Sequence, residues 1–192
     1  MTSASSAPPS RVAALFEEHY PPGTPSREIL WEHQAAVATL ALELADRFLE
    51  ARRDFVEEAA WVHDIGIRYT HAPGILCQGD APYLRHGVIG REICEKAGLP
   101  EHAMVCETHV GTGLTAEEVA ASGYPMPIRD MLPRSLEERL ICYADQFFSK
   151  STPDRLSVEE VRRRVSRHGT APLQRFEALH REFGQGVGRP EE

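Results

Sequence analysis

Apolar residues recur every three or four positions along most of the chain, the spacing that places them on one face of an α-helix. The clearest example covers residues 27–50, where Leu30, Val37, Leu40 and Leu44 share a face. No stretch shows the sustained polar–apolar alternation or the hairpin dipeptides that signal β-strands. The pattern therefore predicts an all-α fold, a helical bundle in a single compact domain.

Capping residues and helix-breaking residues set the expected boundaries. Ser26 and Asp54 are placed as N-caps, and Thr115 with Glu118 and Ser135 with Glu138 have the spacing of a capping box. The stretches 66–82 and 124–134 are rich in Gly or Pro and are predicted to be loops. The predicted helices cover residues 10–20, 27–50, 55–65, 83–97, 100 to about 109, 115–122, 135–150, 157–168 and 171–183.

The length of 192 residues suits one domain with a substantial core. Residues 1–9 are Ser-, Ala- and Pro-rich and are predicted to be a disordered tail, and 185–192 a flexible one. The domain is expected to span 10–184. Within it we place a core at about 27–150, followed by C-terminal helices at 157–183.

Composition and charge narrow the possible functions. The net charge of −8 argues against a nucleic-acid polymer as partner, because such binding needs a basic surface. No segment has the length and apolarity of a membrane span or of a secretory signal, so we expect no membrane contact. The four cysteines form no CxxC pair and none requires a disulfide, which fits the cytoplasm. The oligomeric state is left open, with a homodimer as one possibility.

Four histidines and two aspartates lie near apolar helix faces: His33, His63, Asp64, His86, His109 and Asp145. A histidine on such a face is, taken alone, more often a satisfied core residue than a ligand. A buried carboxylate, however, is costly unless it is paired or bound to metal. Several imidazoles near two carboxylates are satisfied most simply by a divalent metal ion.

The order of these residues resembles that of the HD superfamily of metal-dependent phosphohydrolases. His33, the doublet His63–Asp64 in "HDIG" and Asp145 in "YADQ" match its ligand motifs between about residues 30 and 150. His86 and His109 match the two additional histidines of members that bind two metals. The stretch from "HVGTG" to "QFFSK" is also similar to a subgroup of small HDIG-domain proteins of archaea and bacteria.

The resemblance implies a role for each ligand. His33, His63, Asp64 and Asp145 would hold one divalent ion, and His86, His109 and a bridging Asp64 a second; Fe, Mn, Co, Ni, Zn and Mg remain open. A water activated between the ions would attack the phosphoryl group. His63 and Asp64 are therefore counted among the catalytic residues.

Four positively charged or imidazole side chains near the ligands are candidates for the substrate phosphate: Arg68, His71, Arg85 and Lys150. Arg68 and Lys150 are also assigned catalytic roles, and the loop 66–82 is expected to cover the site. The other histidines, His19, His102, His168 and His180, lie in polar surroundings and are interpreted as surface residues. The run "EEVRRRVSRHG" at 159–169 is interpreted as a solvated helix face rather than an anion site.

The leading hypothesis is a phosphohydrolase that acts on a phosphoester or phosphoanhydride of a small metabolite, a nucleotide being favoured. The main alternative is a mixed-valent di-iron oxygenase, because such enzymes resemble this fold and use the same ligand order. A third hypothesis is a regulatory module with a degenerate site, which the intact ligand set disfavours. Arg68 and Lys150 tilt the choice toward hydrolysis.

Overall fold

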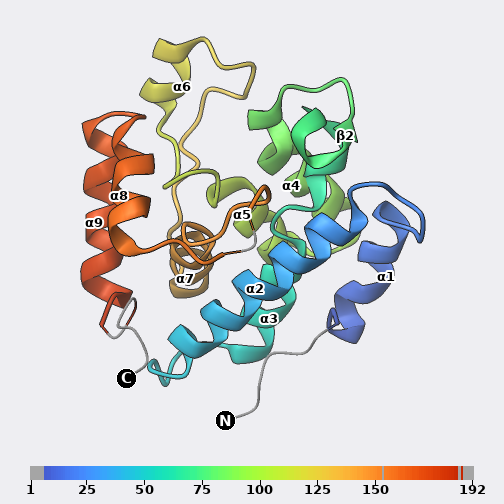
Figure 1. Cartoon of the computed structure of the whole chain (residues 1–192), viewed down its shortest axis with the longest axis horizontal. Coiled ribbons are helices and arrows are strands. Elements are labelled where there is room, and N and C mark those ends of the chain that lie inside the picture. Colours follow the sequence, from blue (N-terminus) through green and yellow to red (C-terminus); the bar gives the residue numbers. More distant parts are fainter. Residues whose placement is uncertain (1–6, 153, 186, 188–192) are drawn as a thin grey trace.

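The computed structural model describes residues 7–152, 154–185 and 187. Residues 1–6 of the predicted N-terminal tail and most of 185–192 lie outside this range. The α-helices are α1 (Ser10–His19), α2 (Arg27–Ala45), α3 (Arg53–Val62), α4 (His86–Lys96), α5 (Pro100–Thr108), α6 (Ala116–Ser122), α7 (Leu136–Asp145), α8 (Val158–Ser166) and α9 (Thr170–Phe183). The all-α prediction is confirmed (Figure 1).

The predicted loop 66–82 contains short regular elements. These are the five-residue 3₁₀ helix η1 (Ile65–Tyr69), the three-residue 3₁₀ helix η2 (Pro73–Ile75) and the two-residue strands β1 (His71–Ala72) and β2 (Cys77–Gln78). The strands pair antiparallel, with His71 opposite Gln78 and Ala72 opposite Cys77. A further 3₁₀ turn, η3 (Tyr83–Arg85), leads into α4. The hairpin is too small to change the fold class.

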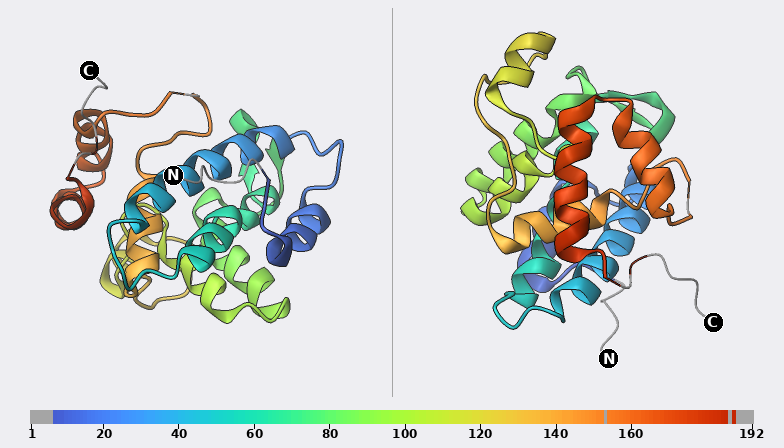
Figure 2. Two further views of the ribbon diagram at one scale, coloured as in Figure 1. Left: turned by 90° about the horizontal axis from the view of Figure 1, so that it is seen from below. Right: turned by 90° about the vertical axis from the view of Figure 1, so that its left-hand side faces the viewer.

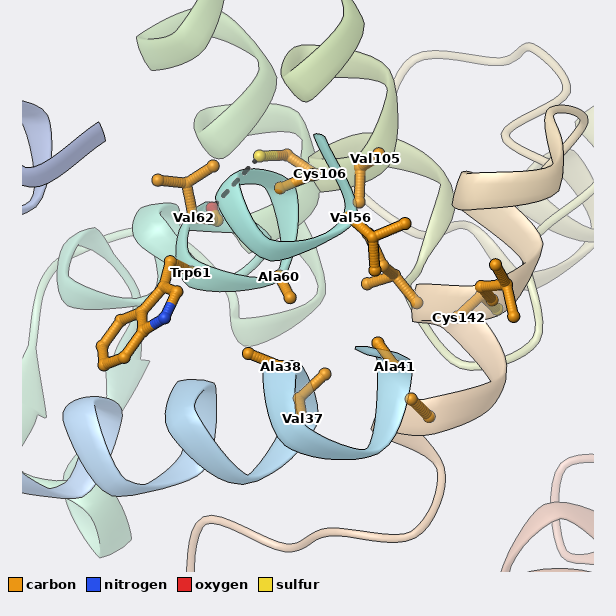
Figure 3. Close-up of a cluster of buried hydrophobic side chains, with 14 of the residues drawn as sticks. Val37, Ala38, Ala41, Val56, Ala60, Trp61, Val62, Val105, Cys106 and Cys142 are labelled. Carbon is orange, nitrogen blue, oxygen red and sulfur yellow. Dashed lines mark hydrogen bonds between the residues drawn. The ribbon is translucent and has the colours of Figure 1, made fainter. Parts of the chain in front are cut away.

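Small side chains bring α2 and α3 close together at the centre of the molecule. Ala38 and Ala41 of α2 face Ala60 of α3, and all three are fully buried (Figure 3). Alanine adds little bulk at a helix interface, so the two backbones can approach closely. On the far side of α3, the Cys106 thiol of α5 donates a hydrogen bond of 3.2 Å to the Val62 carbonyl. This contact places the ends of α3 and α5 beside each other.

The capping predictions were partly right. Thr115–Glu118 and Ser135–Glu138 form complete capping boxes, as does Ser157 with Glu160. Ser26 makes no side-chain cap, because its hydroxyl is buried against the Cys77 thiol. Asp54 was also placed wrongly as a cap, since it lies inside the first turn of α3.

Several helices end earlier than predicted, among them the one expected over 27–50, which ends at Ala45, and two of these ends matter for the site. The helix expected to reach residue 65 ends at Val62, and the one expected to reach residue 150 ends at Asp145. The C-terminal pair α8 and α9 packs together at one side of the molecule, with α9 against α7 (Figures 1 and 2). No helix in the described ranges is long and apolar enough to cross a membrane.

Candidate metal centre

Six side chains from five helices converge at one point in the core: His33, His63, Asp64, His86, His109 and Asp145. His33 lies within α2, whereas the other five lie at helix ends. His63 and His109 are the C-cap residues of α3 and α5, His86 opens α4, and Asp145 closes α7. Asp145 is partly open to solvent, with 15% of its side chain exposed, and the other five are buried.

The end of α3 explains how two adjacent residues reach the same site. His63 keeps helical dihedral angles, with φ −54° and ψ −33°. Asp64 leaves the helix, with φ −104° and ψ 13°, in the bridge region of backbone space. In a continuous helix the two side chains would point about 100° apart around the axis. The change of backbone direction instead lets both face the cluster.

The first half of the cluster surrounds the Oδ2 atom of Asp64. The Nε2 atoms of His33 and His63 lie 3.1 and 3.2 Å from this oxygen. The Asp145 Oδ1 atom lies 3.0 Å from His33 Nε2 and 3.6 Å from His63 Nε2. Four donor atoms from α2, α3 and α7 thus share one small volume.

The second half surrounds the other oxygen of the same carboxylate. The Nε2 atoms of His86 and His109 lie 3.5 and 3.2 Å from Asp64 Oδ1, and 3.3 Å from each other. Asp64 therefore presents one oxygen to each half. A carboxylate placed in this way can bridge two metal ions.

Backbone carbonyls orient three of the imidazoles. The Nδ1–H groups of His63, His86 and His109 donate to the carbonyls of Ala60, Tyr83 and Cys106, at 2.7, 2.7 and 2.8 Å. In the neutral form of each ring, this arrangement leaves Nε2 with a lone pair directed into the cluster. Metal-binding histidines commonly have their second nitrogen fixed in this manner.

The donor atoms fit a metal better than they fit one another. Among the described residues, His33 Nε2, His63 Nε2 and Asp145 Oδ1 are buried without a hydrogen bond of regular geometry, and Asp64 Oδ2 has only its ion pairs with the imidazoles and Lys150. Two ligand atoms that are each about 2.1 Å from one ion, at tetrahedral or octahedral angles, lie about 3.0 to 3.4 Å apart. The spacings in both halves fall close to that range. We therefore conclude that the residues fit one divalent ion in each half.

The electrostatics also favour a cation in the first half. Burial lowers the pKa of His63, but the Asp64 and Asp145 carboxylates outweigh it and raise the pKa to about 10. Burial raises the pKa of Asp64, yet Lys150 and His63 hold it well below its usual value. In the second half, burial dominates and lowers the pKa of His86 to about 4, so this imidazole is neutral and ready to act as a ligand.

Glycines allow α4 to approach close enough to complete the second half. A Cβ on Gly66 would lie 2.2 Å from the His86 carbonyl oxygen and 2.6 Å from the Gly90 nitrogen. A Cβ on Gly87 would lie 2.6 Å from the Cys106 carbonyl oxygen. Since these obstacles are backbone atoms, only glycine permits the observed packing of α4 against η1 and α5. The "HDIG" glycine is thus required by helix packing.

Lys150 reaches the cluster from the chain after α7. Its Nζ atom lies 2.6 Å from Asp64 Oδ2, and its side chain is 12% exposed. Burial lowers the pKa of Lys150, but Asp64, Tyr83 and Asp145 more than compensate and raise it. The ammonium group is therefore charged and stands at the boundary between the cluster and the adjoining pocket.

A pocket of about 880 Å³ opens onto the cluster, and its lining includes His86, His109, Asp145 and Lys150. The loop predicted to cover the site contributes Ala72, Gly74 and Ile75 to one wall. Aromatic side chains line other parts, namely Tyr83, Tyr124 and Phe148. The volume is that of a typical small-molecule site.

Three residues assigned to the substrate lie elsewhere. Arg68 donates to the His19 carbonyl and lines a different hollow, so we no longer assign it to the phosphate. His71 is exposed on β1 and does not belong to the pocket lining. Arg85 is half-buried between two lining residues, but it is not one of them. Lys150 alone of the four reaches the pocket.

Of the histidines interpreted as surface residues, His102 is buried, whereas His168 is exposed as predicted but also lines the pocket. The Nε2 atom of His102 lies 3.1 Å from the Glu58 carboxylate. His168 lines the pocket together with Arg164, in a run that was interpreted as a solvated helix face. The only sequence signal for that wall was the cluster of positive charges itself.

Comparison with known proteins identifies a protein family and several relatives of this chain. The family model of the HD domain matches residues 30–149. An uncharacterized protein of Methanocaldococcus jannaschii is 35% identical over 119 residues, which cover 59% of this chain and 63% of that protein. Two proteins named tRNA (cytidine(56)-2'-O)-methyltransferase also match. The protein from Picrophilus torridus is 28% identical to this chain, over 64% of this chain and 32% of its own length. The protein from Thermoplasma volcanium is 26% identical, over 84% of this chain and 44% of its own length.

The matched segment thus spans less than two thirds of each of these relatives. No solved structure matches the chain significantly.

Proposed function

This chain belongs to the HD domain family, and from that premise we propose that it is a metal-dependent phosphohydrolase. Its substrate would be a phosphoester or phosphoanhydride of a small metabolite, a nucleotide being the class that fits best. The observation that carries the proposal is the Asp64 carboxylate, whose two oxygens face two separate groups of ligands. Such a paired site is suited to clamping the attacking and leaving oxygens of a phosphoryl transfer.

The ligands divide between two divalent ions in this proposal. His33, His63, Asp64 and Asp145 would hold the first, and Asp64, His86 and His109 the second. Bound ions would supply a nucleophile by lowering the pKa of a water, and would polarise the phosphoryl oxygens. The Nδ1–H bonds of His63, His86 and His109 to backbone carbonyls keep the three rings oriented for this purpose.

Lys150 is the residue we assign to the phosphoryl group. Its charged Nζ lies at the junction of the cluster and the pocket, within reach of an anion that enters from the pocket side. A charged hydrogen bond from this ammonium would offset the negative charge of the phosphoryl oxygens. Because its side chain is mostly buried, water screens this interaction less than at the surface.

The pocket supports a nucleotide as the substrate class. Tyr83, Tyr124 and Phe148 offer aromatic surface on which a base can stack, and the volume of about 880 Å³ accommodates a mononucleotide. The tRNA methyltransferases are similar over 32% and 44% of their own lengths, so methyl transfer is not proposed for this chain.

Hydrolysis is tested with protein loaded in turn with manganese, iron, cobalt, nickel, zinc and magnesium. Phosphate release is measured over a panel of nucleotides and sugar phosphates. For the best substrate, Lys150→Gln is expected to lower kcat/KM by about 10- to 100-fold, the effect of losing a charged hydrogen bond. Lys96→Gln, which removes an exposed lysine at the end of α4, is the matched control. Equal kcat/KM in the two variants would remove Lys150 from the mechanism.

The di-iron oxygenase remains the competing proposal, because the ligand order is common to both chemistries. Its specific signature is a mixed-valent EPR signal in protein purified in air. The absence of that signal, together with phosphate release, favours the hydrolase.

A further inference from the structure

One wall of the pocket comes from helices that follow the part of the chain matched by the HD model. The model match ends at residue 149, whereas Arg164, Val165 and His168 of the α8 region and Pro172 of α9 line the pocket. In Figure 2, α8 and α9 form a separate layer beside the helices that carry the ligands. This wall is therefore an addition to the metal-binding core.

Hydrogen bonds fix the wall to the segments that follow two of the ligands. Arg164 Nη2 donates to the Gln146 carbonyl at 2.5 Å, and Gln146 Nε2 donates to the Gly111 carbonyl at 2.6 Å. The Thr112 hydroxyl donates to the Pro172 carbonyl at 3.2 Å. Gln146 directly follows Asp145, and Gly111 lies two residues after His109. The wall thus has a defined position relative to the cluster.

The charges of this wall favour an anion. Arg164 is half-buried, and within the described ranges no carboxylate forms an ion pair with it. Its contact with Gln146 uses one of five guanidinium N–H groups. The imidazole of His168, one helical turn further on, adds a hydrogen-bond donor to the same wall. The guanidinium of Arg164 and the imidazole of His168 together offer the hydrogen-bond donors that bind an anion such as phosphate.

The carboxylates that line the pocket do not repel an anion at the α8 wall. The pocket lining includes two of them, Asp145 and Glu118. Asp145 belongs to the metal cluster, and Glu118 lies 2.9 Å from the Arg175 guanidinium, which neutralises it. Lys150 is itself paired with Asp64, so Arg164 carries the positive charge of the pocket lining that has no carboxylate partner among the described residues.

We propose that Arg164 and His168 bind a second phosphate group of the substrate, one that is not hydrolysed. That this group belongs to the substrate rests on the proposed function. The substrate would be a bisphosphorylated small molecule, with one phosphate at Lys150 and the metal cluster and the other at the α8 wall. The aromatic side chains of the pocket would contact the part between them.

The test uses phosphonates, whose carbon–phosphorus bonds keep binding independent of turnover. Alkylene bisphosphonates with two to six carbons are compared with alkyl monophosphonates of equal length, by calorimetry on the metal-loaded protein. At the length that spans both sites, the bisphosphonate is expected to bind about 10-fold more tightly, the effect of one charged hydrogen-bonded contact. Arg164→Gln should reduce this ratio to about two.

Arg167→Gln is the matched control, since it removes the same charge from the same end of α8 outside the pocket. It should leave the ratio unchanged. His168→Gln, at an exposed position, serves as a second variant if Arg164→Gln fails to fold, and should lower the ratio in part. A ratio near one at every length, or an equal loss in Arg164→Gln and Arg167→Gln, would overturn the second phosphate site. Because no bond is cleaved, these results do not depend on whether phosphoesters are hydrolysed.

Discussion

Gly87→Ala should remove the second metal ion while leaving the first in place. The new Cβ would lie 2.6 Å from the Cys106 carbonyl oxygen and 2.7 Å from Val110 Cγ2, whereas ordinary contacts begin at 3.4 Å. Helices α4 and α5 must therefore separate by about 0.8 Å. Each helix carries one histidine of the second half, so the substitution acts directly on their spacing.

The expected displacement is large on the scale of metal coordination. His86 Nε2 and His109 Nε2 are 3.3 Å apart, and a shift of about 0.8 Å would bring them to about 4.1 Å. Two nitrogens at about 2.1 Å from one ion reach that separation only in a nearly linear arrangement, which tetrahedral sites do not provide. The overpacking should also cost about 1 to 3 kcal/mol of unfolding free energy. For a chain of this size that corresponds to a fall in Tm of roughly 2 to 12 °C.

Metal content by mass spectrometry and Tm by calorimetry measure both effects. The natural protein is expected to hold two ions and Gly87→Ala one, since His33, His63 and Asp145 do not depend on the contact between α4 and α5. Gly74→Ala is the control, because a Cβ there meets nothing within 4 Å. Two ions per chain and an unchanged Tm in Gly87→Ala would refute the proposed role of the close helix contact.

Three other predictions concern the ligands and the ion pairs. Asp64→Ala should abolish activity and weaken the binding of both ions, because the two oxygens of the Asp64 carboxylate face the two halves of the cluster. The control His180→Ala, on α9, should do neither. Similar metal content and activity in the two variants would show that the site is misassigned. Chelation of the natural protein should lower its stability by about 2.7 kcal/mol for each ion lost, relative to protein in metal at 100 times the Kd, and an equal Tm in both would contradict a structural role for the ions. Glu137, whose pKa is lowered because its bonds to Arg52 outweigh burial, should stabilise the fold above its ordinary pKa of 4.5 and lose that contribution as the pH falls. Glu137→Gln should therefore cost about 1 kcal/mol in urea unfolding at pH 7 and progressively less toward pH 3, and a loss independent of pH would exclude the charge as its cause.

The helices and the six clustered residues were accessible from sequence because each has a local signal. The helical periodicity, the capping boxes and the order of the histidines and aspartates can be recognised without knowing which distant residues are in contact. The capping boxes at Thr115 and Ser135 were placed correctly for this reason. Ser26 was not, since its hydroxyl is directed to Cys77, a partner 51 residues away that no local pattern reveals.

The substrate side of the site was harder to predict because it depends on tertiary packing. Arg68 follows the ligands in sequence, but η1 turns its side chain toward the carbonyl of His19. His102 has polar neighbours in sequence, yet α5 buries it against Glu58 of α3. Arg164 stands in a run of charges typical of a solvated helix, and only the docking of α8 places it in the pocket. Proximity in sequence to a ligand was a poor guide to proximity in space.

Phosphate release under strictly anaerobic conditions distinguishes hydrolysis from oxidation by this protein. Protein stripped of metal and reloaded with manganese under argon is incubated with the nucleotide panel, and inorganic phosphate is measured over time. We predict phosphate release under argon that Asp64→Ala abolishes, because the proposed hydrolysis requires two divalent ions and a water but no oxidant. Product formed only with iron and dioxygen, and absent under argon, would contradict the hydrolase and establish the oxygenase in its place.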